Sequence, residues 1–123
     1  IKCGYAEIIK HALIHDKQFF EWLDKNYKDI LKLNLLKLEE AIYKSILIKS
    51  FYVKNDYREY LKNYKSRAML NFGHSFGHAL ETFYKYKLSH GEAISVGMII
   101  ESKISFKYLI KISYSFYYLI FIP

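Results

Sequence analysis

Apolar residues recur at helical spacing through most of the chain. Near the N-terminus, apolar positions three and four residues apart predict a helix over residues 5–14. Asp16 can cap a second helix, which we expect to reach Asn26 and to be followed by a short helical turn over residues 29–33. A long helix is expected over residues 35–53. The next residues, to Lys65, are charged and rich in Tyr and suit either a loop or a short helix.

The second half of the chain follows the same helical period. The pattern predicts one helix over residues 66–84, in spite of two internal glycines, and another from Ser89 to about Tyr108. Ser89 and Glu92 form an S-x-x-E capping box, which places His90 at the first helical position with its side chain free to point into a cleft. The expected fold class is therefore all-α, a multi-helix domain.

The C-terminal end differs from the rest of the chain. Residues 112–123 carry no charge, but this stretch is too short for a bilayer, which takes about 20 residues. We expect a helical domain over residues 1–110 and a divergent or truncated tail over residues 111–123. The first residue is Ile1 rather than Met, which suggests a fragment.

Composition and charge narrow the function classes. A chain of 123 residues with 52% hydrophobic and 25% charged residues fits one globular domain. The single Cys3 excludes a disulfide scaffold and fits a reducing compartment. The formal net charge of +7 suggests nucleic acid or a membrane surface, but the lysines are scattered and only Arg58 and Arg67 are arginines. We therefore expect neither nucleic acid nor a membrane as partner.

Polar side chains form a line along the predicted 66–84 helix. Spacings of 4, 3, 4 and 3 place on one face Arg67, Asn71, His74, His78 and Glu81. A solvated face is the ordinary interpretation, but solvated faces favour Lys and Glu over His and Asn. Gly73 and Gly77 each cost the helix about 1 kcal/mol relative to Ala, so we expect a close approach to a neighbour or a ligand. The pattern favours a polar cavity.

Two histidines in this line suit a metal ion. His74 and His78 are one helical turn apart and can chelate zinc from one face. The chain has no His-Glu-x-x-His motif, so a metalloprotease would lack its general base. Catalytic zinc usually takes three protein ligands. Spacing leaves the third ligand open among Glu7, His11, His15, Glu81 and His90.

Lys49 falls on an otherwise apolar stripe of the expected 35–53 helix. The stripe has spacings of 3, 4, 4, 3 and 4 and comprises Leu35, Leu38, Ile42, Ile46, Lys49 and Val53. The lysine either reaches back to the surface or ends in a cavity, where its ammonium needs an anion.

Three motifs occur in a defined order along the chain. They are Cys-Gly-Tyr-Ala-Glu-Ile-Ile-Lys at residues 3–10, Arg-x-x-Leu-Asn-Phe-Gly-His-Ser-Phe-Gly-His-Ala-Leu-Glu at residues 67–81, and His-Gly-Glu-Ala at residues 90–93. Together they resemble the 3-dehydroquinate synthase family over roughly residues 3–107. The resemblance implies the C-terminal, helical half of the dehydroquinate synthase-like fold. The family's N-terminal half, with its parallel sheet and NAD site, has no counterpart here, so no cofactor-binding residue is expected.

The resemblance also assigns residues. It implies a site for Zn²⁺ or Co²⁺ made of Glu7, His74 and His90. It assigns His78 to a contact with the substrate near its phosphate rather than to metal binding. The positions that match substrate-binding residues are Lys10, Lys49, Arg67, Asn71 and His78. Of these, the expected catalytic residues are Lys10, Lys49 and His78. Residues 60–65 are extra relative to the family, and Ser75 stands where the family usually has Thr.

The reaction implied by the resemblance belongs to the shikimate pathway, which leads to chorismate and the aromatic amino acids. The substrate, 3-deoxy-D-arabino-heptulosonate 7-phosphate, is a phosphorylated sugar acid that is converted to 3-dehydroquinate with loss of phosphate. NAD oxidises a hydroxyl transiently, and zinc acts as a Lewis acid that lowers the pKa of this hydroxyl. The family implies a cytoplasmic lyase that is a homodimer at full length. We expect the isolated fragment to be inactive.

Two alternatives stay open. One is a related sugar-phosphate cyclase or a metal-dependent polyol dehydrogenase. Such dehydrogenases tend to have Asp where Glu7 stands and need no anion clamp, so Lys10 and Arg67 favour the cyclase. The other is an inactive helical fragment that binds zinc and does nothing else, or a helical interaction module.

Overall fold

The computed structural model describes the backbone of residues 2–121 and the side chains of residues 3–108. This described part is helical and contains no strand, which confirms the all-α fold class. Its elements are α1 (Lys2–His15), α2 (Lys17–Leu31), α3 (Leu35–Asn55), the 3₁₀ helix η1 (Arg67–Asn71), α4 (His74–Phe83) and α5 (His90–Phe121).

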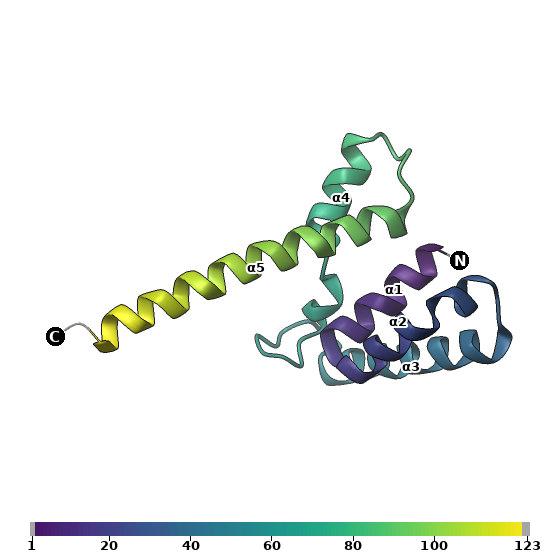
Figure 1. Cartoon of the computed structure of the whole chain (residues 1–123), viewed down its shortest axis with the longest axis horizontal. Helices are drawn as coiled ribbons and strands as arrows, with labels where there is room; N and C mark the ends of the chain where they lie inside the picture. Colours follow the sequence, from purple (N-terminus) through teal and green to yellow (C-terminus); the bar gives the residue numbers. More distant parts are fainter. Residues whose placement is uncertain (1, 122–123) are drawn as a thin grey trace.

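The first three helices pack into a bundle around one apolar core (Figure 1). Its buried members are Ile8, Ala12, Phe19, Leu23, Ile30, Ala41, Ile48 and Tyr52. Asp16 caps α2 as predicted, because its Oδ1 accepts a hydrogen bond from the Phe19 amide at 2.9 Å. Burial of large apolar side chains on facing helical stripes is what holds this part together.

Helix α2 is longer than predicted, because residues 29–31 continue it rather than form a separate turn. Two features explain the extension. Ile30 is fully buried in the bundle core, and the Lys37 ammonium of α3 donates to Asn26 Oδ1 at 2.6 Å and to Asp29 Oδ2 at 2.7 Å. The chain then turns at Leu33, which has a φ of 65°.

Helices α4 and α5 form a second unit, here called the arm (Figure 1). They approach each other through glycines: a Cβ on Gly77 would lie 2.6 Å from Ile94 Cδ1, and a Cβ on Gly97 would collide with the Gly73 carbonyl oxygen. The predicted close approach is therefore to a neighbouring helix. The beginning of α5 also packs against α1, and its other end projects away from the bundle (Figure 1).

The single helix predicted over residues 66–84 is wrong. The chain forms η1 to Asn71 and starts α4 only at His74, with a break between them. Gly73 has a φ of 82°, a left-handed conformation that glycine adopts without steric cost, and its amide donates to Glu101 Oε2 at 2.8 Å. Arg67 and Asn71 are therefore not on the helix that carries His74, and the continuous polar stripe does not exist.

A loop joins α3 to η1 and contains residues 60–65. Asp56 is buried, and its carboxylate accepts hydrogen bonds from the amides of Tyr60, Leu61 and Arg67 and from the Ser66 hydroxyl. Burial raises the pKa of Asp56, but these hydrogen bonds outweigh it and hold the pKa below its usual value. An ordered loop anchored at one carboxylate can accept extra residues at its exposed tip.

Helix α5 runs to Phe121, further than the predicted end near Tyr108. The side chains of the expected tail, residues 111–123, lie outside the described residues. Among the helices described, none combines the length and the apolarity that crossing a bilayer takes.

Candidate metal and substrate site

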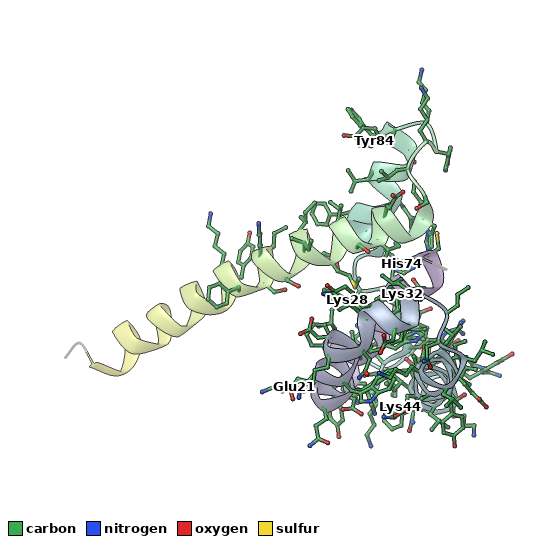
Figure 2. All side chains as sticks on the ribbon, turned by 45° about the vertical axis from the view of Figure 1, so that its right-hand side comes forward. Glu21, Lys28, Lys32, Lys44, His74 and Tyr84 are labelled. Atoms are coloured by element: carbon green, nitrogen blue, oxygen red, sulfur yellow. The ribbon has the colours of Figure 1, made fainter. Side chains whose placement is uncertain are left out.

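Three elements meet at the candidate metal ligands. Glu7 comes from α1, whereas His74 and His90 are the first residues of α4 and α5. Figure 2 shows His74 where the arm meets the N-terminal end of α1. Glu7 Oε1 lies 4.0 Å from His74 Nε2 and 3.9 Å from His90 Nε2. A divalent ion with bonds of about 2 Å fits between ligand atoms at such separations.

Glu7 presents one carboxylate oxygen that has no hydrogen-bond partner among the described residues. Its Oε2 accepts from the Lys10 ammonium at 2.7 Å, but its Oε1 is buried and has no hydrogen bond within the described part of the chain. Burial raises the pKa of Glu7, yet the Lys10 hydrogen bond and charge outweigh burial and lower the pKa. The group is therefore an ionised carboxylate with a vacant acceptor aimed at two histidines, which is the donor chemistry that zinc takes.

Both candidate histidine ligands have the tautomer that metal binding needs. His74 Nδ1 lies 3.3 Å from the Phe72 carbonyl oxygen, and His90 Nδ1 lies 2.9 Å from Glu81 Oε1. Each of these acceptors requires a proton on Nδ1, which leaves the Nε2 lone pair for the ion. Burial, followed by the nearby Lys10 charge, lowers the pKa of His74 and favours the neutral ring.

His78 lies beside the ligands but faces another partner. Its ring centre is 5.3 Å from that of His74, and its Nδ1 lies 2.8 Å from Glu81 Oε2. Two groups of three donors are close enough for one ion among the described residues, and neither joins His74 with His78. The first group is Glu7, His74 and His90, and the second is His78, Glu81 and His90. The arrangement thus disfavours the chelate considered from spacing alone.

The other two histidines belong to the bundle. His11 is buried, with its Nδ1 2.7 Å from Ser45 Oγ, and His15 lies 3.4 Å from the Tyr52 hydroxyl. Burial, with the Lys10 charge next in size, lowers the pKa of His11 to about 4. These contacts remove His11 and His15 from the candidate third ligands.

The predicted substrate-binding residues are divided between two places. Lys10 is buried beside Glu7, and His78 lies beside His74. Arg67 instead donates to the Tyr57 carbonyl oxygen at 3.2 Å. The break at Gly73 separates η1 from α4, which the spacing argument did not foresee.

Asn71 and Lys49 have no hydrogen bond or ion pair with the arm histidines among the described residues, although the Lys49 charge lies near enough to His11 to lower its pKa. Asn71 donates to Glu59 Oε1 at 3.2 Å and lines a cavity of about 510 Å³. Lys49 is exposed and lines a groove with Ile46 and Val53. Ile46 of the same stripe is 56% exposed, so the stripe itself lies at the surface and Lys49 does not have to reach out of a buried face.

Two acidic residues have roles that the sequence analysis missed. Glu81 joins His78 and His90 through its two carboxylate oxygens. Glu101 accepts from the Gly73 amide, and its Oε1 is buried without a partner among the described residues. The spacing of three between His78 and Glu81 could have indicated the first contact. Only the tertiary packing of α5 on α4 reveals the second.

Comparison with known proteins gives a consistent result. Residues 4–115 match the family model described as "3-dehydroquinate synthase C-terminal". The 3-dehydroquinate synthase of Pelagibacter ubique is 45% identical over 100 residues, which is 80% of this chain and 26% of that protein. That of Prochlorococcus marinus is 48% identical over 107 residues, or 85% of this chain and 28% of that protein. The chain therefore spans little more than a quarter of these curated relatives, and the match extends beyond the expected residue 107.

Proposed function

Because this chain belongs to the 3-dehydroquinate synthase family, we propose that it supplies the metal- and substrate-binding part of a 3-dehydroquinate synthase. The reaction converts 3-deoxy-D-arabino-heptulosonate 7-phosphate to 3-dehydroquinate with loss of phosphate. The relatives that carry this name support the proposal, and the chain spans 26% to 28% of the two compared above.

One observation carries the proposal. Glu7 Oε1 is buried, has no hydrogen-bond partner in the described structure, and lies about 4 Å from Nε2 of both His74 and His90. Leaving a buried carboxylate oxygen unsatisfied costs about 1–3 kcal/mol or more. A Zn²⁺ or Co²⁺ ion held by these three residues would remove that cost.

The chain's own residues support substrate binding and proton transfer. Bound metal would polarise a substrate hydroxyl as a Lewis acid, and NAD would accept the hydride. Lys10 holds the Glu7 carboxylate and has further N–H donors for an anionic substrate. His78 is 63% exposed, and because Glu81 engages its Nδ1, its Nε2 is left to exchange a proton with a phosphate.

Arg67, Asn71 and Lys49 complete the proposed substrate contacts. None of them has a hydrogen bond or ion pair with the arm histidines in the described structure, so substrate would have to bridge from the histidines to them. Arg67 uses one guanidinium donor on the Tyr57 carbonyl, which leaves others for a carboxylate or phosphate. The exposed Lys49 ammonium is accessible to an anion.

The family resemblance supports three further parts of the proposal. NAD would bind mainly to sequence that this chain does not contain. The full-length enzyme would be a cytoplasmic homodimer. We therefore expect the 123-residue chain alone to be inactive.

A chimaera tests this function. Residues 4–115 would replace the matching part of the Geobacillus kaustophilus 3-dehydroquinate synthase, which is 46% identical over 100 residues, and phosphate release would be measured with zinc and NAD. We expect release by the chimaera and none by residues 1–123. Arg67→Lys and Lys49→Ala should each lower kcat/KM roughly 10- to 150-fold. Lys49→Ala removes a charged donor, and Arg67→Lys keeps the charge but loses the planar guanidinium fork.

Lys25→Ala is the control, since Lys25 is an exposed lysine of α2 outside the groove that Lys49 lines, and it should stay within twofold of the parent. The proposal fails if the chimaera folds and binds zinc but releases no phosphate. Turnover by residues 1–123 alone would refute the expected inactivity. If Arg67→Lys and Lys49→Ala both stay within twofold, the substrate-binding assignment is wrong.

A further inference from the structure

Glu81 occupies an unusual position between two histidines. It lies on α4 one turn after His78, and across the α4–α5 connection it meets His90. Its Oε2 is 2.8 Å from His78 Nδ1, and its Oε1 is 2.9 Å from His90 Nδ1. Its side chain is 12% exposed, compared with 63% for His78 and 43% for His90. One largely buried carboxylate thus accepts hydrogen bonds from two more exposed imidazole rings.

This arrangement determines where each ring carries its proton. An ionised carboxylate can only accept, so both Nδ1 atoms must donate to it. Each ring then has Nε2 directed away from Glu81. For His90, that atom lies 3.9 Å from Glu7 Oε1, on the side where the metal is expected.

The two histidine ligands differ in what holds them. His74 Nδ1 has the neutral Phe72 carbonyl as its partner, at 3.3 Å, whereas His90 has a carboxylate at 2.9 Å. A carboxylate behind a ligating imidazole orients the ring and increases its basicity. His90 also needs such support more, because it is the more exposed of the two.

We propose that Glu81 is a positioning residue that fixes His90 for the metal and His78 for the substrate through a single carboxylate. This inference rests on the proposed metal site at Glu7, His74 and His90. It predicts that the metal site and the substrate-contacting histidine depend on the same group, although neither Glu81 nor His78 is itself a ligand of that ion.

Glu81→Gln is the decisive variant, because it keeps the size of the side chain but replaces one of its two acceptor oxygens with an NH₂ donor. The amide oxygen can accept from one ring, but the amide nitrogen must donate to the other. The second ring then loses its Nδ1 proton to Nε2. When that ring is His90, its Nε2 has no lone pair for the metal.

The test uses the full 123-residue chain and two measurements. Zinc affinity is measured by competition with a chromophoric chelator, and the histidine tautomers are read from ¹⁵N–¹H correlation spectra of the zinc-free chain. We expect Glu81→Gln to weaken zinc binding 10- to 100-fold and to remove the Nδ1–H tautomer from His78 or His90. The charge-matched control is Glu39→Gln, an exposed acid on α3, which should leave both readouts unchanged.

The inference is overturned if Glu81→Gln binds zinc within twofold of the parent chain and both rings keep the proton on Nδ1. The tautomer measurement needs neither metal nor activity, so it tests Glu81 even if the parent chain binds no zinc, a result that would instead refute the proposed metal site. Far-UV circular dichroism establishes that the variant is folded. His78→Gln provides a second check, because it removes one partner and should leave zinc binding largely intact.

Discussion

The bundle and the arm are held together in different ways. In the bundle of α1–α3, large apolar side chains such as Phe19, Leu23 and Tyr52 are buried against one another. In α4, by contrast, the buried residue is Gly77, and the arm depends on backbone-to-backbone approach between α4 and α5. Apolar burial tolerates small shifts by repacking, whereas close backbone contact does not. The bundle thus contributes most of the buried apolar surface, and the arm fixes the relative positions of α4 and α5.

The proposed metal ligands are divided between these two regions. Glu7 belongs to the bundle, and His74 and His90 belong to the arm. Each arm histidine begins its helix, so its position depends directly on how α4 and α5 are placed. A bound ion would therefore join the two regions, and a change in the arm should affect metal binding more than a change in the bundle core.

The largest effect on the arm is expected from Gly97→Ala. The added Cβ would collide with the Gly73 carbonyl oxygen and would lie 2.9 Å from the Gly77 amide nitrogen, so α4 and α5 must separate. Overpacking of this kind costs about 1–3 kcal/mol. Because metal ligands must lie within about 0.2 Å of their ideal distances, zinc affinity should fall at least tenfold. Urea unfolding and chelator competition measure the two effects.

Two controls sharpen this comparison. Leu23→Ala should lower the free energy of unfolding by about 2–5 kcal/mol, yet the folded molecules should bind zinc within about threefold of the parent chain. Gly4→Ala should be neutral or stabilising, because a Cβ at Gly4 meets nothing within 4 Å in a helix. Equal zinc affinities for Gly97→Ala and Leu23→Ala would contradict the division of roles.

A smaller effect on the free energy of unfolding should come from protonation of His11 in the bundle at low pH. The pKa of His11 is lowered by burial to about 4, so between about pH 6.5 and 4 the unfolded chain binds more protons than the folded chain at this residue. Stability should therefore fall with falling pH, by about 1 kcal/mol between pH 7 and 5.5 for this group. In His11→Asn, whose side chain can still reach Ser45, the free energy of unfolding should depend less on pH by this amount. Urea unfolding at several pH values measures this dependence. If the free energy of unfolding changes equally with pH in the variant and the parent chain, His11 is not a neutral, buried residue.

Local signals in the sequence identified most of the fold. The cap at Asp16, the capping box of Ser89 with Glu92, and the helical period predicted the starts of α2 and α5. The break at Gly73 escaped prediction, because a left-handed glycine inside a helical pattern looks like any other glycine until its neighbours are known. Its cause is tertiary: the Glu101 carboxylate of α5 accepts from the Gly73 amide.

The site was only partly accessible from the sequence. Spacing alone favoured His74 with His78, whereas Glu7 and His90 reached the ligand set through the family resemblance. The structure places Glu7, His74 and His90 together from three separate helices, which no local pattern encodes. The substrate-binding assignments of Arg67 and Lys49 remain predictions, because the contacts described for these residues are with the Tyr57 carbonyl oxygen and with a groove on α3.

Zinc stoichiometry in two single variants tests the central claim most directly. Zinc per chain would be measured after gel filtration for the parent chain, His74→Ala and His78→Ala. We expect one ion in the parent, none in His74→Ala and close to one in His78→Ala, because His74 directs its Nε2 at Glu7 whereas His78 is held by Glu81. Equal loss of zinc in both variants would favour a His74–His78 chelate and contradict a site built from Glu7, His74 and His90.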